Sequence, residues 1–167
     1  MKAWIEKHSL WLSLIPVLLI MGMIFGFSAQ DGGESGALSG GMVAWLVERV
    51  VPGFAALPPH QQESIRSTVG FIIRKTAHFS EYALLGFFLM LHIRQIAKRI
   101  LVKVHCLWAW AVGTLYAVSD EIHQMFVPGR GPAVRDVCID SAGVAAGIAL
   151  LCLIWRIHTC NSGKRKL

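Results

Sequence analysis

The chain contains four apolar runs long enough to cross a membrane as helices, and ionisable side chains lie inside three of them. The runs occupy residues 10–27, 69–93, 104–126 and 137–157. A spanning helix needs about 20 residues, and lipid offers its backbone polar groups no partner outside the helix. The pattern therefore predicts an all-α fold: a polytopic membrane protein with four transmembrane helices in a single domain over residues 1–167.

Composition favours the same class of protein. Hydrophobic residues make up 54% of the chain and charged residues 16%, with a mean hydropathy of +0.55, whereas a soluble domain carries about 25% charged residues. The net charge of +6 does not predict nucleic-acid binding, because the lysines and arginines gather at the ends of apolar runs instead of alternating with aromatic residues. The four cysteines form no CxxC pair, and we interpret them as packing residues.

The first run follows two lysines and has some features of a secretory signal. It is longer than the apolar core of a signal, which has about 7 to 15 residues. If cleavage followed Ala29, the residue at position 27 would also have to be small, and that position is occupied by Phe27. We therefore expect an uncleaved spanning helix over residues 10–27.

The segment between the first two runs, residues 28–67, is polar and rich in glycine. Within it, apolar residues recur at helical spacing over residues 43–54, opposite two charged side chains. This pattern predicts an amphipathic interfacial helix in the first external loop, either at the membrane surface or packed as a cap on the bundle. Pro58 and Pro59 indicate a turn and the start of the next helix.

Basic residues predict the orientation in the membrane. The short loop after the second run contains four of them: Arg94, Lys98, Arg99 and Lys103. Further lysines and arginines flank both chain ends, and short cytoplasmic loops carry an excess of these residues. We therefore expect a multi-pass cell-membrane protein with both termini cytoplasmic, and with residues 28–67 and 127–135 outside.

With this topology, the polar ends of all four helices meet in the outer leaflet. The polar residues step by three or four along each helix, and so form one stripe per helix. The stripe on the second helix comprises Arg74, His78 and Glu81, the stripe on the third Tyr116, Asp120 and His123, and the stripe on the fourth Asp136 and Asp140. A charge near the bilayer centre costs about 2.5 to 3.5 kcal/mol, and facing the bundle interior to pair lowers that cost. The stripes predict a shared polar pocket, although an isolated ion pair could instead serve only to fix helix register.

Three kinds of chemistry fit such a pocket. Histidine beside carboxylates suits proton transfer, which makes His78, Glu81, Asp120, His123 and Asp140 the candidate catalytic residues. A divalent metal on His78, Glu81, Asp120 and His123 is permitted by the spacing, which is not diagnostic. The third is binding of an anionic headgroup by basic side chains, with apolar helix walls for a lipid chain.

Three sequence blocks carry a resemblance to a known family. They are FSAQDGGESGALS (27–39), RKTAHFSEYALLGFFL (74–89) and YAVSDEIHQMFVPGRGPAVRDVCIDSAGVAAG (116–147). These blocks resemble the VanZ-like family of bacterial integral membrane proteins, with Ala29 as one mild departure from a motif that often reads Ser-Ser-Gln. The family pattern falls on Ser28, Gln30, Lys75, His78, Tyr82, Asp120, Glu121, Gln124, Arg130, Asp136, Asp140, Gly143 and Gly147. The last two also form a GxxxG spacing, which lets a neighbouring helix approach closely.

The resemblance implies an envelope function without settling a reaction. The family's namesake is associated with resistance to teicoplanin, a glycopeptide with a lipid tail, more than to vancomycin. We expect an outward-facing pocket that binds or modifies an envelope lipid or a lipid-linked cell-wall precursor. The candidate binding residues are Ser28, Gln30, Arg74, Lys75, Tyr82, Glu121, Gln124, Arg130 and Asp136. An intramembrane hydrolase or transferase is the alternative, and ion or proton transport is weaker because no comparable polar groups continue into the cytoplasmic half.

Overall fold

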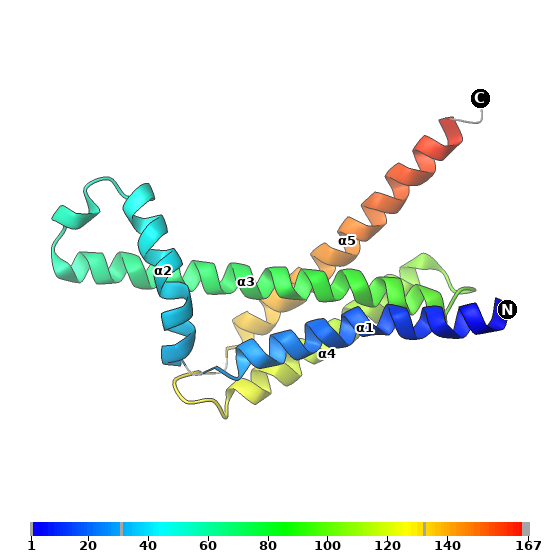
Figure 1. The fold of residues 1–167 in the computed structure, drawn as a ribbon, viewed down its shortest axis with the longest axis horizontal. Coiled ribbons are helices and arrows are strands. Elements are labelled where there is room, and N and C mark those ends of the chain that lie inside the picture. The colour runs from blue at the N-terminus through cyan, green and yellow to red at the C-terminus, as the bar shows by residue number, and fades with distance from the viewer. Residues whose placement is uncertain (1, 31, 132, 165–167) are drawn as a thin grey trace.

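The computed structural model describes the backbone of residues 2–30, 32–131 and 133–164, and the side chains of 10–30, 40–131 and 133–160. Asp31 and the side chains of the glycine-rich stretch that follows it therefore lie outside the described residues. The described chain is helical, as predicted, and contains no strand. Its elements are α1 (Lys2–Ser28), α2 (Gly32–Val50), η1 (Phe54–Ala56), α3 (Pro59–Ile96), α4 (Val102–Gln124) and α5 (Val134–Lys164) (Figure 1).

Two helices meet a length and hydropathy standard for crossing a membrane. They are the Leu10–Ser28 part of α1, with a mean hydropathy of 2.3, and the Val134–Cys160 part of α5, with 2.2. Charged and polar side chains lower the hydropathy of α3 and α4. The structure thus supports a membrane protein. By this measure, two of the four predicted spans qualify as membrane-crossing helices.

Helix α3 is the centre of the architecture, because it packs against α1, α2, α4 and α5. Helices α1 and α4 lie alongside it, while α5 crosses it obliquely and diverges towards the C-terminus (Figure 1). Ile24, Tyr82, Met90 and Val144 are among the buried residues of the core between these helices. Large apolar side chains such as Leu19 and Leu115, both 68% exposed, cover the outer faces. An exposed apolar surface of this kind is typical of contact with lipid.

The crossing of α3 and α5 depends on glycine. A Cβ atom at Gly143 would lie 2.5 Å from the carbonyl oxygen of Phe79, and one at Gly147 would overlap the carbonyl of Ala83. On the other helix, a Cβ atom at Gly86 would overlap the backbone of Val144. The close helix approach predicted from the GxxxG spacing is confirmed, and it fixes where α5 meets the middle of α3.

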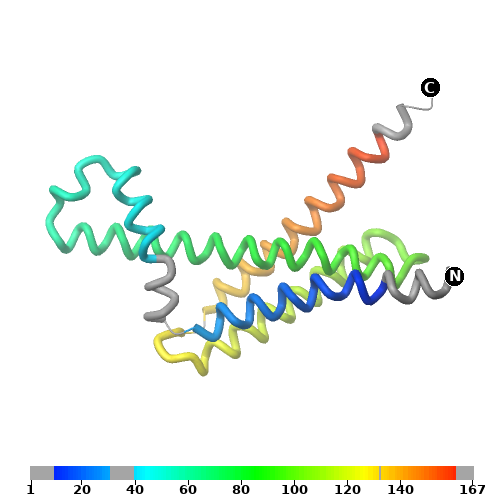
Figure 2. The backbone as a smooth tube through the Cα atoms, viewed as in Figure 1, coloured from blue at the N-terminus to red at the C-terminus, as the bar shows by residue number. Residues whose placement is uncertain are grey.

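The predicted external loop forms a helical hairpin. Helix α2 leads through η1 into the first part of α3 (Figure 2). Helix α3 begins at Pro59, where the two prolines indicate a start, and thus ten residues before the predicted start at residue 69. Val43, Val47 and Phe54 form a second small core there, against partly buried residues of α3 that include Ile65 and Val69. The amphipathic segment therefore packs on the first part of α3.

Candidate functional site

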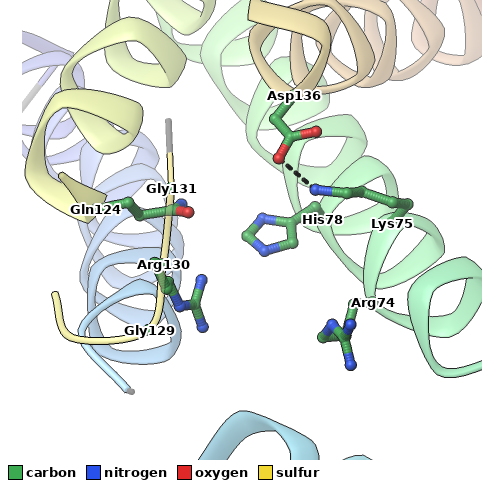
Figure 3. Close-up of a pocket in the computed structure, with 8 residues that line it drawn as sticks. All are labelled: Arg74, Lys75, His78, Gln124, Gly129, Arg130, Gly131 and Asp136. Atoms are coloured by element: carbon green, nitrogen blue, oxygen red, sulfur yellow. Dashed lines mark hydrogen bonds and ion pairs between the residues drawn. The ribbon is translucent and has the colours of Figure 1, made fainter. Parts of the chain in front are cut away.

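The structure brings the end of α4, the connection that follows it, the start of α5 and the middle of α3 together around one polar cavity. The cavity has a volume of about 260 Å³. Its lining comprises Arg74, Lys75, His78, Gln124, Gly129, Arg130, Gly131 and Asp136 (Figure 3). Six of these eight residues are sequence-predicted site residues, so the structure brings these six side chains to one cavity.

Basic side chains dominate the lining. Arg74 and Lys75 come from α3, and Arg130 faces them from the connection between α4 and α5 (Figure 3). Asp136 is the carboxylate among the described lining residues, and it forms an ion pair with Lys75. The two arginines therefore leave the cavity with an excess of positive charge.

Arg130 is fixed in place by the end of α1. Its Nε donates to the carbonyl oxygen of Gln30 at 3.0 Å, and its Nη2 donates to that of Phe27 at 3.1 Å. The last carbonyls of a helix have no partner within it and carry a partial negative charge, so a guanidinium suits this position. Burial lowers the pKa of Arg130, but an arginine starts so far above neutrality that it stays charged.

A hydrogen-bond network connects α1 to α4 beside the cavity. Ser28 Oγ donates to Asp120 Oδ2 at 2.8 Å, and Gln124 Nε2 donates to the same oxygen at 3.0 Å. Gln124 Nε2 also lies 3.2 Å from Ser28 Oγ. All three side chains are buried, with Ser28 completely inaccessible. The network holds one oxygen of Asp120 in a single position.

Three ionisable residues converge behind the cavity wall. His78 of α3, Asp120 of α4 and Asp140 of α5 each place a nitrogen or oxygen atom within 4.8 Å of the other two. Asp120 and Asp140 are buried, and His78 also lines the cavity. This triad of His78, Asp120 and Asp140 suits either metal binding or proton transfer.

Other predicted site residues have supporting positions. Glu121 accepts a hydrogen bond from the backbone N–H of Ala133, which ties α4 to the connection that carries Arg130. Tyr82 is fully buried, with its ring centroid 6.2 Å from that of Tyr116. Tyr116 in turn donates to the carbonyl oxygen of Met21 at 2.6 Å. These contacts fix the helices around the site.

Two candidate metal ligands lie apart from the triad. The ring of His123 packs against Phe25, with 4.4 Å between centroids. Glu81 is half-buried and belongs neither to the cavity lining nor to the triad. The structure therefore groups Asp140, in place of Glu81 and His123, with His78 and Asp120. Gln30 contributes its backbone carbonyl to Arg130.

Sequence reasoning missed two lining residues, Gly129 and Gly131, which approach the cavity with backbone alone. Gly129 has a φ of +75°, a conformation that glycine adopts without strain. The signal was the Pro-Gly-Arg-Gly string around Arg130, which indicates a turn.

These features define a helical membrane protein with a polar, cationic cavity at one end of its bundle. The VanZ/LLP1 family model matches residues 13–156, and the chain belongs to that family. No curated protein and no solved structure gives a significant match.

Proposed function

We propose that α1, α3, α4 and α5 all cross the membrane, with the cavity in the outer leaflet and both termini in the cytoplasm. The support is the separation of charges along α3. The cavity adjoins Arg74 and His78, whereas the basic loop around Arg99 follows the opposite end of the helix. The positive-inside bias assigns that loop to the cytoplasm. The hairpin of α2 then lies outside the cell.

In this orientation, the cavity binds the phosphate of an envelope lipid or of a lipid-linked cell-wall precursor. The single observation that carries this proposal is the placement of Arg74 and Arg130 on opposite sides of one cavity, with Lys75 beside them. Arginine pairs are well suited to phosphate because each guanidinium offers several N–H donors in a plane. Two backbone glycines leave room for the ligand.

A lipid is favoured over a free anion by apolar hollows near the cavity, which share lining residues with it and with one another. Lys75 also lines a second hollow, which contains Phe79, and Phe79 in turn lines a third hollow between α3 and α5. The third hollow has a volume of about 440 Å³ and an apolar wall that includes Ala83, Phe87 and Leu150. The third hollow would accommodate part of the hydrocarbon chain of a lipid whose headgroup is bound beside Arg74.

The proposal is tested by lipid retention on the protein purified in detergent. The probes are a diacyl lipid with a phosphomonoester headgroup, diacylglycerol with the same chains, and inorganic phosphate, each measured by native mass spectrometry. We expect retention of the phospholipid over both others. Replacing both arginines (Arg74→Gln, Arg130→Gln) should weaken it by at least about tenfold, because each charge-assisted hydrogen bond contributes about 1.5 to 3 kcal/mol.

Arg66→Gln is the matched control, since Arg66 lies over the Phe54 ring in the hairpin and outside the cavity. It should retain the lipid as the parent protein does. Equal retention of diacylglycerol, or undiminished retention by the double variant, would overturn headgroup binding. Preference for inorganic phosphate over the lipid would assign the cavity to a free anion.

A further inference from the structure

We propose that His78, Asp120 and Asp140 bind a divalent transition-metal ion, Zn²⁺ or Mn²⁺. The three residues come from three different helices, and their donor atoms lie within 4.8 Å of one another. One imidazole and two carboxylates match the ligand types of both ions. This site differs from the sequence-predicted set in using Asp140, and it lies next to the headgroup cavity without depending on it.

Asp120 and Asp140 are buried carboxylates that a bound cation would stabilise. Asp120 is 2% exposed and Asp140 is 3% exposed, so both carboxylates are removed from water. Within the described part of the chain, the ion pairs of Lys75 and Arg135 go to Asp136, and none reaches Asp120 or Asp140. Buried charges are expected to be paired or to coordinate a metal, and among the described residues neither carboxylate has a lysine or arginine within ion-pair distance.

Unused donor atoms point to the same conclusion. Asp120 Oδ2 accepts hydrogen bonds from Ser28 and Gln124, whereas Asp120 Oδ1 is buried with no hydrogen-bond partner. The Nδ1 atom of His78 is likewise buried and without a partner. The Tyr82 hydroxyl is also buried without a partner, and it lies close enough to Asp120 to interact with it. Buried polar atoms are nearly always satisfied, so Asp120 Oδ1 can accept from Tyr82 or bind a metal ion, and His78 Nδ1 is open to the same ion.

The donor atoms of the triad lie at most 4.8 Å apart, a separation that metal coordination would shorten. Ligand atoms around a tetrahedral zinc ion lie about 3.3 Å apart, given metal–ligand distances near 2.0 Å. Three protein ligands leave at least one coordination position open, as in catalytic zinc sites. Because His78 belongs both to the triad and to the cavity lining, the proposed metal site lies next to the cavity. Ser28 and Gln124 would act as positioning residues by orienting Asp120.

The first experiment measures metal content. The full chain is purified in detergent without chelator and analysed by plasma mass spectrometry, then stripped with chelator and titrated with Zn²⁺ and Mn²⁺ by calorimetry. We expect about one ion per chain and a Kd of about 1 μM or tighter for one of them, together with a higher Tm for the loaded protein. Parent protein that neither carries nor takes up either ion would overturn the proposal, and would indicate that one carboxylate is held protonated.

Variants locate the site. Asp140→Asn and His78→Ala should lose the ion, whereas Glu81→Gln and His123→Asn, the matched controls outside the triad, should keep it. Gln124→Leu should lower the affinity for the ion by about 10- to 100-fold without abolishing binding, as is typical when a residue that orients a metal ligand is lost. Retention of the ion by Asp140→Asn, or its loss in both controls, would contradict the assignment. The lipid-retention measurement is repeated on metal-stripped protein. If that protein still retains the phospholipid, failure of the metal site leaves headgroup binding intact, so the two proposals can fail separately.

Discussion

At the scale of single residues, the difference between three-residue and four-residue steps explains why His123 and Glu81 lie apart from the triad. An α-helix turns by about 100° per residue, so a four-residue step returns within about 40° of the starting direction and a three-residue step falls about 60° short. Gln124 therefore stays beside Asp120, while His123 turns towards Phe25. Likewise Tyr82 is fully buried four residues after His78, and Glu81 is half-buried. Sequence spacing alone could not separate these cases, because each depends on where the neighbouring helix lies.

The Ser28 hydrogen bond to Asp120 should stabilise the fold measurably. Ser28→Ala leaves a buried carboxylate oxygen with one donor fewer, which we expect to cost about 1 to 3 kcal/mol. Combined with Asp120→Ala, the same serine change should cost less than about 0.5 kcal/mol, because the acceptor has gone. The measurement is a double-mutant cycle on unfolding in detergent. Ser119→Ala is the control, since Ser119 is exposed and donates its hydrogen bond within its own helix. Additive losses of stability in the Ser28 and Asp120 variants would exclude coupling between the two residues.

At the scale of helices, the sequence predicted the element order and the close approach of α5, but not the angle at which α5 crosses α3. Gly143 and Gly147 signalled a helix contact because their spacing places both on one face. The partner surface, which includes Gly86 and Ala83, lies in a run with no GxxxG motif of its own. The hairpin of α2 was likewise identified as amphipathic, although its partner on α3 depends on the turn at Gly53, which has a φ of +70°.

Gly147→Ala should destabilise the bundle by about 1 to 3 kcal/mol. A methyl group there meets the Ala83 backbone, which cannot rotate away as a side chain could, so the helices must separate. Gly22→Ala is the matched control, because a Cβ atom at that position in α1 has nothing within 4 Å. Thermal unfolding in detergent compares the two variants. Equal stability of both would mean that the α3–α5 contact in solution is looser than the structure describes.

At the scale of the whole molecule, the apolar runs and the basic loop determine the topology that we propose, and reporter fusions test it. A reporter inserted at Ala97, between α3 and α4, should be active only as a cytoplasmic reporter. One inserted at Gly53, in the turn of the α2 hairpin, should be active only as an external reporter. The opposite pair of results would move the cavity to the inner leaflet. The same readout at both positions would remove α3 from the set of spanning helices.

If the cavity lies in the outer leaflet, as we propose, we expect the protein to distinguish two related antibiotics. Teicoplanin has a fatty chain that anchors it in that leaflet, where lipid-linked precursors are exposed, and vancomycin has none. Expression of this protein in a susceptible Gram-positive host should therefore raise teicoplanin tolerance more than vancomycin tolerance, as measured by minimum inhibitory concentrations. The effect should disappear in Arg74→Gln, Arg130→Gln, which removes the charges across the cavity, and persist in Arg66→Gln at equal membrane levels. Equal tolerance to both drugs, or full tolerance without the two arginines, would separate family membership from this function, since a shared fold does not by itself carry an activity.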